Sequence, residues 1–347
     1  MKVVHLLPAL EQGGVETVVC DLVRALSGWE SVVVSKGGRL VARVEEAGGR
    51  HVTLDLKSKN PLTYFSRARQ LRRILREEQP DLVCAHSRVP AWLFVWANRG
   101  LGLRWITYAH GANSVSRYSE VMTRGDLVIV PSRFLADYLK ANYGTGESKI
   151  RVIPNSVDAQ RFDPERIDRA FVEDKRREWG IREGDRVSMA IGRITPVKGL
   201  EGLIRDLAAR SREDSAAKLK LVIVGGADKH HLKYLETLKA LAKDVRRETA
   251  DVIFAGPQEK IPECISLADE IVSGNTTKPE TFGLSVVEAY AMDKPVRAKR
   301  FGGVAEVMAA VEGAGKATLR EAVLSLYGLD RQAERTRAAY REVLDMV

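Results

Sequence analysis

Short apolar runs alternate with amphipathic runs along most of the chain. Apolar runs rich in β-branched residues predict strands, and apolar side chains recurring every three or four positions predict helices. The pattern predicts strands at 2–6, 31–35, 51–55, 81–85, 104–109, 126–130 and 149–153, and then at 186–191, 219–224, 251–255, 270–273 and 295–298. It predicts helices at 15–27, 62–78, 89–98 and 132–143, and then at 198–211, 229–247, 258–267, 282–292 and 330–345.

Regular alternation of strands and helices is typical of the α/β class, with parallel sheets covered on both faces. The segment 163–185 is dense in charge and interrupts the alternation, so we expect it to link two doubly wound domains. The predicted domains cover residues 1–165 and 166–328, and residues 329–347 form a last helix. Ligands of such sheets bind beyond the carboxyl ends of the strands, which indicates a cleft between the two domains.

The balance of charge narrows the class of partner. With 55 basic and 46 acidic residues the 347-residue chain carries a formal charge of +9, which suits nucleic acid, an anionic membrane surface or a phosphorylated small molecule. Aromatic residues make up 6% of the chain and no basic stretch is interleaved with them, so nucleic acid is not expected as a partner.

Two features of the chain indicate its compartment. No apolar run is long enough to span a membrane, and the first residues lack a signal peptide's apolar stretch. The three cysteines lie far apart in apolar runs, which predicts buried thiols in a reducing compartment. We therefore expect a cytoplasmic protein, or one peripheral to the cytoplasmic face of the inner membrane.

Two loops could bind phosphate. Gly13 and Gly14 follow the first strand and open a helix, where backbone N–H groups and a close approach suit an anion. Arg193 and Lys198 bracket the loop after strand 186–191, and two such cations could neutralise a diphosphate. A simple glycine turn and a solvated basic loop are the alternative interpretations.

The segment 278–288 carries the strongest signal. Pro279 and Thr281 predict a helix start, with Glu280 at the helix mouth and Glu288 two turns further on. Eight residues at the helical rise separate the two carboxylates by about 12 Å, roughly the span from the sugar to the ribose of a nucleotide-diphosphate sugar. Each carboxylate could accept two vicinal hydroxyls. A charge that only satisfies the helix dipole is the alternative for Glu280.

One histidine is a candidate for the reaction itself. His110 follows strand 104–109 at a carboxyl end, where its ring could donate to a sugar hydroxyl or meet a developing charge. A structural role in the loop fits equally well, and His86 has the same position after strand 81–85 with a weaker case. No carboxylate cluster or His/Cys spacing indicates a metal site, so no bound metal is expected.

Seven short motifs and their order along the chain resemble those of glycosyltransferase family 4. Members of this family are retaining, nucleotide-sugar-dependent enzymes with the GT-B fold of two Rossmann-like domains. Several stretches of the first domain are similar to bacterial cell-envelope and lipopolysaccharide transferases. The motifs are Gly13-Gly14-Val15-Glu16, His110-Gly111, Val130-Pro131-Ser132, Ile153-Pro154-Asn155 with Asp158, Gly192-Arg193 with Lys198-Gly199, Glu280 with Glu288, and Gly302-Gly303-Val304-Ala305-Glu306. One departure is Asp293, where the family usually has glycine.

The resemblance implies a role for each matching residue. It makes His110 and Glu280 catalytic, with the histidine beside the reacting carbon and the carboxylate on the donor sugar. It assigns binding of the donor's phosphates, sugar or ribose to the other matching residues: Gly13, Gly14, Arg193, Lys198, Phe282, Gly283, Leu284 and Glu288. In this fold the last helix, 329–347, crosses back onto the first domain.

The resemblance further implies a metal-independent transferase that moves a sugar from a nucleotide-diphosphate sugar to a cell-envelope glycan or glycolipid, such as a lipopolysaccharide core. No cofactor is expected beside the donor. Two alternatives are a sugar-nucleotide epimerase of the same fold and a basic peripheral membrane protein that has lost catalysis.

The predicted helix 62–78 is basic and amphipathic. Its five arginines could lie on anionic lipid, at roughly 1 kcal/mol for each basic residue near the surface. The alternative is a domain helix whose apolar stripe, including Leu71 and Leu75, faces the sheet while the arginines are solvated.

Overall fold

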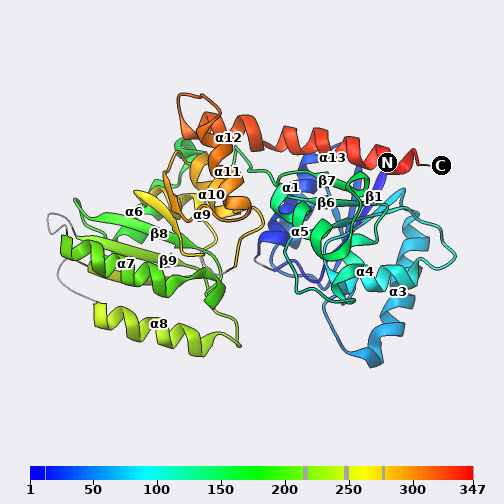
Figure 1. Cartoon of the computed structure of the whole chain (residues 1–347), viewed down its shortest axis with the longest axis horizontal. Coiled ribbons are helices and arrows are strands. Elements are labelled where there is room, and N and C mark those ends of the chain that lie inside the picture. Colours follow the sequence, from blue (N-terminus) through cyan, green and yellow to red (C-terminus); the bar gives the residue numbers. More distant parts are fainter. Residues whose placement is uncertain (12, 214–217, 246–249, 276–277, 347) are drawn as a thin grey trace. The chain divides into compact units, whose positions relative to one another are not determined.

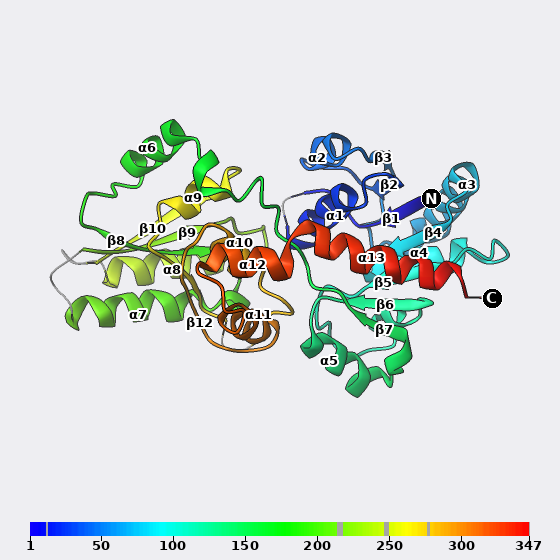
Figure 2. The ribbon, with the colours of Figure 1, turned by 90° about the horizontal axis from the view of Figure 1, so that it is seen from above.

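The computed structural model describes residues 1–11, 13–213, 218–245, 250–275 and 278–346 (Figures 1 and 2). The chain divides into two compact units. The first unit consists of Met1–Ser156 with Tyr327–Val347, and the second unit is Val157–Leu326. The division falls earlier in the chain than residue 165, where we expected the first domain to end.

A seven-stranded parallel sheet forms the centre of the first unit, with strand order β3-β2-β1-β4-β5-β6-β7. Val, Ile and Leu dominate these strands because both faces of the sheet are covered. The strands are β1 (Lys2–Leu6), β2 (Glu30–Ser35), β3 (Arg50–Thr53), β4 (Leu82–Ala85), β5 (Trp105–Tyr108), β6 (Leu127–Val130) and β7 (Ile150–Val152).

Helices cover both faces of this sheet. The last helix of the chain, α13 (Leu329–Leu344), lies beside α1 (Gly14–Ala25), as both views show. On the other face, α3 (Tyr64–Glu78) and α4 (Arg88–Ala97) lie side by side and share one apolar core with β1, β2 and β4. The remaining helices of the unit are α2 (Val41–Glu46) and α5 (Arg133–Tyr143).

The second unit has a five-stranded parallel sheet with strand order β10-β9-β8-β11-β12. Helices α7 (Leu200–Glu213) and α8 (Leu232–Val245) pack together on one face (Figure 1). The strands are β8 (Arg186–Ile191), β9 (Leu219–Val224), β10 (Ala250–Gly256), β11 (Glu270–Ser273) and β12 (Val296–Ala298). The other helices are α6 (Arg169–Glu178), α9 (Ile261–Ser266), α10 (Leu284–Ala291), α11 (Gly303–Glu312) and α12 (Leu319–Tyr327).

Short 3-10 turns complete the described elements. They are η1 (Pro61–Thr63), η2 (Ser119–Thr123), η3 (Glu147–Lys149), η4 (Pro164–Arg166) and η5 (Pro196–Lys198). The α/β class and its parallel sheets are thus confirmed, and each predicted strand has a counterpart in the structure.

The predictions failed on four helices that the sequence pattern did not reveal, namely α2, α6, α11 and α12. The segment 163–185 is not a plain linker, because it contains α6 and lies within the second unit. Helix α8 begins at Leu232, later than the predicted start at residue 229, and residues 246–247 of that prediction lie outside the described residues.

The three cysteines are buried and free, which confirms the expectation of buried thiols. Across the described ranges, no helix combines the length and the apolar character needed to cross a bilayer.

Candidate functional site

In the second unit, a small pocket lies at the carboxyl ends of the central strands, where three loops pack backbone against backbone. The Gly192 amide donates to the Val224 carbonyl at 2.9 Å, which ties the loop after β8 to β9. Gly199 contacts the loop after β11 so closely that a Cβ there would lie 1.9 Å from the carbonyl oxygen of Gly274. Only glycine allows this approach, and its φ of +61° is also one that glycine favours.

A cation and a carboxylate meet in this pocket. Lys198, at the end of η5, forms an ion pair with Glu280, with the lysine Nζ on the glutamate Oε1. The Asn275 side-chain amide donates to the same Glu280 oxygen at 2.7 Å. Both side chains of the ion pair are mostly buried, at 32% exposed for the lysine and 18% for the glutamate. The carboxylate is therefore held in one position from two sides.

The pocket also contains groups suited to an anion. Arg193 lines it from the loop after β8, is exposed, and has no ion-pair partner among the described residues. Ser285 lines it from the first turn of α10, whose leading N–H groups have no partner within the helix. The lining as a whole is Ala190, Ile191, Gly192, Arg193, Lys198, Leu200, Leu203, Ile223, Val272, Ser273, Gly274, Glu280 and Ser285.

The helix of this segment starts later than predicted. Helix α10 begins at Leu284 with Gly283 as its N-cap, so Glu280 precedes the helix. Glu280 pairs instead with Gly302 in a short parallel bridge, and the Gly303 amide donates to the Glu280 carbonyl at 2.8 Å. The predicted spacing of about 12 Å along one helix therefore does not apply to Glu280 and Glu288.

Gly283 has a structural reason to be glycine. Its φ is +98°, and a Cβ would lie 2.8 Å from Cγ2 of Val304. Phe282 beside it is buried, and Glu288 is partly buried on α10. The structure thus brings Arg193, Lys198 and Glu280 into one pocket. Phe282, Gly283 and Leu284 lie at the start of the adjacent helix, and Glu288 lies further along it.

The remaining predicted residues belong to the first unit. Gly13 is the N-cap of α1 in an extended conformation, and Gly14 is the first residue of that helix. A Cβ on Gly13 would lie 2.4 Å from the Glu16 carboxylate, which is the flexible end of a side chain. The backbone conformation therefore does not require glycine at position 13. Close approach of a ligand is another reason why glycine would be needed there.

His110 follows β5 and belongs to a row of three histidines. Its Nε2 lies 3.0 Å from Nδ1 of His86, and His86 Nε2 lies 3.1 Å from Nδ1 of His5. Burial lowers the pKa of His5 and of His110 to about 4. Burial, and secondarily the two neighbouring histidines, lowers the pKa of His86 well below its usual value. All three rings are therefore neutral at pH 7.

Sequence reasoning missed two residues of these clusters. Asn275 follows β11 and could have been found as a polar residue at the carboxyl end of a buried strand. His5 lies within β1, where the strand pattern treats it as one more buried position. Among the described residues, no group of three or more His, Cys, Asp and Glu side chains could hold a metal ion.

The predicted membrane helix has its apolar stripe in the core. Ala68, Leu71 and Leu75 of α3 are buried in the cluster shared with the sheet, so this stripe is not free to enter lipid. The exposed apolar side chains nearby are Leu62 and Phe65, 90% and 55% exposed.

Two sequence models of known families match this chain. Glycosyltransferase Family 4 matches residues 12–161, and Glycosyl transferases group 1 matches residues 171–317. Two α/β units, each with a parallel sheet, are the architecture of the GT-B glycosyltransferases. The chain belongs to this class, and within it to the glycosyltransferase family 4 group.

Relatives and solved structures agree with this assignment. A D-inositol 3-phosphate glycosyltransferase of Nocardia farcinica is 29% identical over 186 residues, which is 53% of this chain and 40% of the relative. The matched region thus spans less than half the length of that curated relative. Anabaena HepE, solved with UDP and glucose, has a TM-score of 0.82 at 17% identity and covers 98% of this chain and 99% of its own. WaaG, a glycosyltransferase involved in lipopolysaccharide biosynthesis, has a TM-score of 0.63 at 17% identity, with coverage of 98% and 95%.

Proposed function

We propose that the chain is a retaining glycosyltransferase that takes a sugar from a nucleotide-diphosphate sugar bound in the second unit. One observation carries this proposal: Lys198, Glu280 and Asn275 form one hydrogen-bonded cluster in a pocket that Arg193 also lines. Two cations suit a diphosphate, and a fixed carboxylate suits the hydroxyls of a sugar.

The chemistry follows from these charges. When the sugar–phosphate bond breaks, negative charge grows on the departing diphosphate, and Arg193 and Lys198 stabilise it together with the N-terminus of α10. Glu280 loses part of its contact with Lys198 as the phosphates arrive, and its oxygens then accept from the sugar. These groups supply the positive charge within the chain itself, so transfer is expected to proceed without a metal ion.

His110 is the proposed residue of the first unit at the reacting carbon. As a neutral ring it can donate or accept one hydrogen bond without repelling the positive charge that develops on the sugar. Retention of configuration is expected by attack from the face of the leaving group, with the leaving phosphate taking the acceptor's proton. Gly13 and Gly14 are the proposed first-unit contacts of the diphosphate.

The acceptor is proposed to be a cell-envelope glycan or glycolipid. The fold likeness to WaaG supports a lipopolysaccharide-type acceptor, and the name of the Nocardia relative supports a phosphorylated one. Both are anionic, which suits a chain with a formal charge of +9.

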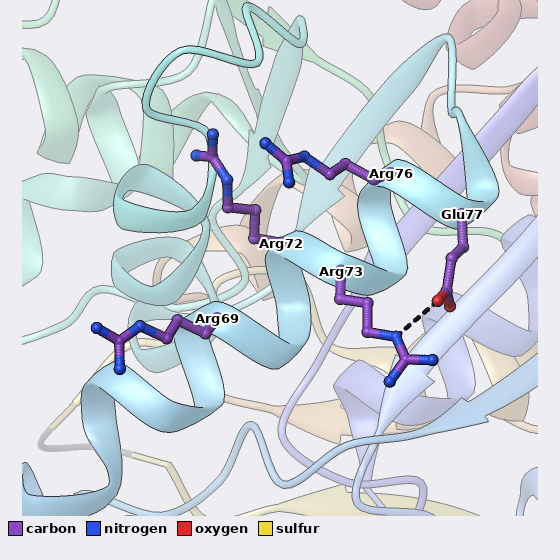
Figure 3. A pocket seen from close by; sticks show the side chains of 5 residues that line it. All are labelled: Arg69, Arg72, Arg73, Arg76 and Glu77. Atoms are coloured by element: carbon purple, nitrogen blue, oxygen red, sulfur yellow. Dashed lines mark hydrogen bonds and ion pairs between the residues drawn. The ribbon is translucent and has the colours of Figure 1, made fainter.

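Helix α3 is the proposed contact with an anionic membrane surface. Arg69, Arg72, Arg73 and Arg76 project from it around one shallow hollow, where Glu77 is the single acidic residue (Figure 3). Arg73 pairs with Glu77 and Arg72 donates to the Ala97 carbonyl at 3.0 Å, so these two are engaged. Among the described residues, Arg69 and Arg76 have no ion-pair partner, and lipid phosphates could bind them.

Sedimentation with lipid vesicles tests this contact. Wild-type protein is expected to bind vesicles with anionic lipid and not neutral ones. The double variant Arg69→Gln/Arg76→Gln should bind about thirtyfold more weakly, because each of the two cations contributes about 1 kcal/mol. Arg166→Gln/Arg177→Gln, on the second unit, removes the same charge as a control. Equal loss in both variants would mean that only the net charge matters.

A thermal-shift panel tests the proposed function. The protein is heated with UDP, GDP, ADP or CMP and their common sugar conjugates, first without metal and then with EDTA. A nucleotide present at about 100 times its Kd stabilises the protein by about 2.7 kcal/mol. One clear shift that survives EDTA supports the proposal. A flat panel would favour the basic membrane protein without catalysis.

A further inference from the structure

We infer that His86 and His5 are positioning residues that hold the ring of His110 in one orientation and make its tautomer the one that all three rings share. The proposed function enters this inference only in placing His110 at the reacting carbon. The row of three rings itself is a property of the first unit and is tested there without a substrate.

The three histidines come from three adjacent strands. His5 lies in β1, His86 follows β4, and His110 follows β5, and these strands are neighbours in the sheet. The hydrogen bonds of 3.1 Å and 3.0 Å join them in the order His5, His86, His110. The sheet thus sets the spacing of the row, and it brings together two histidines that are 105 positions apart in the sequence.

The two hydrogen bonds couple the tautomers. A neutral imidazole has one N–H and one acceptor nitrogen, so each of these bonds needs one proton between its two nitrogens. If His86 donates from Nδ1 to His110, its Nε2 must accept from Nδ1 of His5. If it donates from Nε2 to His5, its Nδ1 must accept from Nε2 of His110. In the first arrangement all three rings carry their proton on Nδ1, and in the second all three carry it on Nε2.

Stacking fixes the planes of the rings. The His86 and His110 centroids are 5.3 Å apart at 19°, and Tyr108 stacks on His86 at 4.8 Å and 18°. A flip of the His110 ring would replace Nε2 by a carbon and break its bond to His86. The orientation of the His110 ring is therefore set by the row, and its Nδ1 atom donates or accepts according to the tautomer that the three rings share.

The surroundings keep the row neutral. The titratable groups that the structure records against it are Tyr108, through its stacked ring, and beyond it Tyr340 and Cys84, joined to each other at 3.2 Å. Burial raises the pKa of Cys84 to about 12 and raises the pKa values of both tyrosines, so all of these groups are uncharged at pH 7. His5 Nε2 is buried with no hydrogen-bond partner among the described residues, so the row ends there.

Long-range ¹⁵N–¹H spectra of histidine-labelled, ligand-free protein test the inference, because they report the tautomer of each of the six histidines. In the wild type, His5, His86 and His110 are expected to share one tautomer and to stay neutral down to about pH 5, below the ordinary histidine value. His86→Phe keeps a ring in the stack but removes both bonds, so the signals of His5 and His110 should average between tautomers. Tyr108→Phe keeps the stack and the row, and its histidine signals should match the wild type.

Different tautomers within the wild-type row, or an unchanged His110 signal in His86→Phe, would overturn the inference. If His86→Phe does not fold, His5→Leu takes its place: His86 and His110 must still share one tautomer, and unlike tautomers there would contradict the coupling. A failed nucleotide panel with a single shared tautomer would reject the proposed function and leave this inference standing.

Discussion

Gly199, beside the candidate donor site, is a residue whose position requires glycine. Its backbone lies against the Gly274 carbonyl, and this contact sets where the preceding residue, Lys198, can direct its side chain toward Glu280. The direction of the Lys198 side chain thus depends on a neighbouring glycine. The pattern of charges in the sequence does not indicate this dependence.

We predict that Gly199→Ala lowers the free energy of unfolding by more than about 2 kcal/mol, because it adds a Cβ at positive φ and in contact with a backbone oxygen. Gly202→Ala is the matched control, since nothing lies within 4 Å of its Cβ and it is in helix α7. Gly202→Ala should raise the free energy of unfolding by about 0.5–1 kcal/mol. Urea unfolding measures both, and equal effects would contradict the packing described.

Glu280 is predicted to compete with phosphate for Lys198. Glu280→Gln removes the ion pair, so a nucleoside diphosphate should bind about three to ten times more tightly, which corresponds to about 1 kcal/mol. In this variant the matching sugar nucleotide should no longer bind more tightly than the diphosphate alone, because glutamine is a weaker hydrogen-bond acceptor than glutamate for the sugar hydroxyls. Titration calorimetry measures both ligands, with the exposed Glu259→Gln as control. Weaker binding of the diphosphate would show that Lys198 does not bind it.

At the scale of elements, hydrophobic periodicity is sufficient for the strands but not for every helix. The strands were predictable because buried parallel strands are short, apolar and rich in β-branched residues. Helix α6 has no buried residue, and Phe171 and Val172 are its only large apolar side chains, so its apolar stripe is too short to predict a helix. Its remaining signal was Asp168, whose side chain caps the helix by accepting from the Phe171 amide at 3.1 Å.

Part of the candidate site was predictable, because charged residues near strand ends can be recognised in a sequence. Arg193, Lys198 and Glu280 are charged residues at strand ends, which a sequence reveals. The true start of α10 was not predictable, because Gly283 is an N-cap with a positive φ and Glu280 before it pairs with Gly302 instead of lying at the mouth of the helix. Asp293 adopts φ +56°, where the family usually has glycine, and this left-handed turn is tolerated by aspartate.

The row of histidines makes the first unit sensitive to acid. The folded pKa values are lowered, so the unfolded chain binds more protons below about pH 6.5 and stability falls as pH decreases toward about 4. At pH 5 the loss is on the order of 2 kcal/mol for each such histidine. His5→Leu should therefore lose about 2 kcal/mol less between pH 7.5 and pH 5 than the wild type.

Urea unfolding at these two pH values measures the difference between the variants. His230→Gln, at an exposed position of the second unit, is the control and should follow the wild-type curve. The same pH dependence in His5→Leu as in the wild type would mean that His5 is protonated in the folded state.

At the scale of the whole molecule, the chain consists of two units that contain different candidate functional groups. The second unit, which Glycosyl transferases group 1 matches, holds the cation–carboxylate pocket. The first unit, which Glycosyltransferase Family 4 matches, holds the row of histidines and the arginines of α3. The last helix, α13, belongs to the first unit and buries Tyr340 against β4 and β5, so the first unit is built from both ends of the chain.

Titration calorimetry on Lys198→Ala tests the central claim most directly. The wild-type protein is titrated with the nucleoside diphosphate that shifts its melting temperature most, in the presence of EDTA. We predict a measurable Kd for the wild type, at least about a tenfold higher Kd for Lys198→Ala, which corresponds to about 1.4 kcal/mol, and no change for the exposed Lys243→Ala on α8. Equal affinity of wild type and Lys198→Ala would contradict a diphosphate site in this pocket.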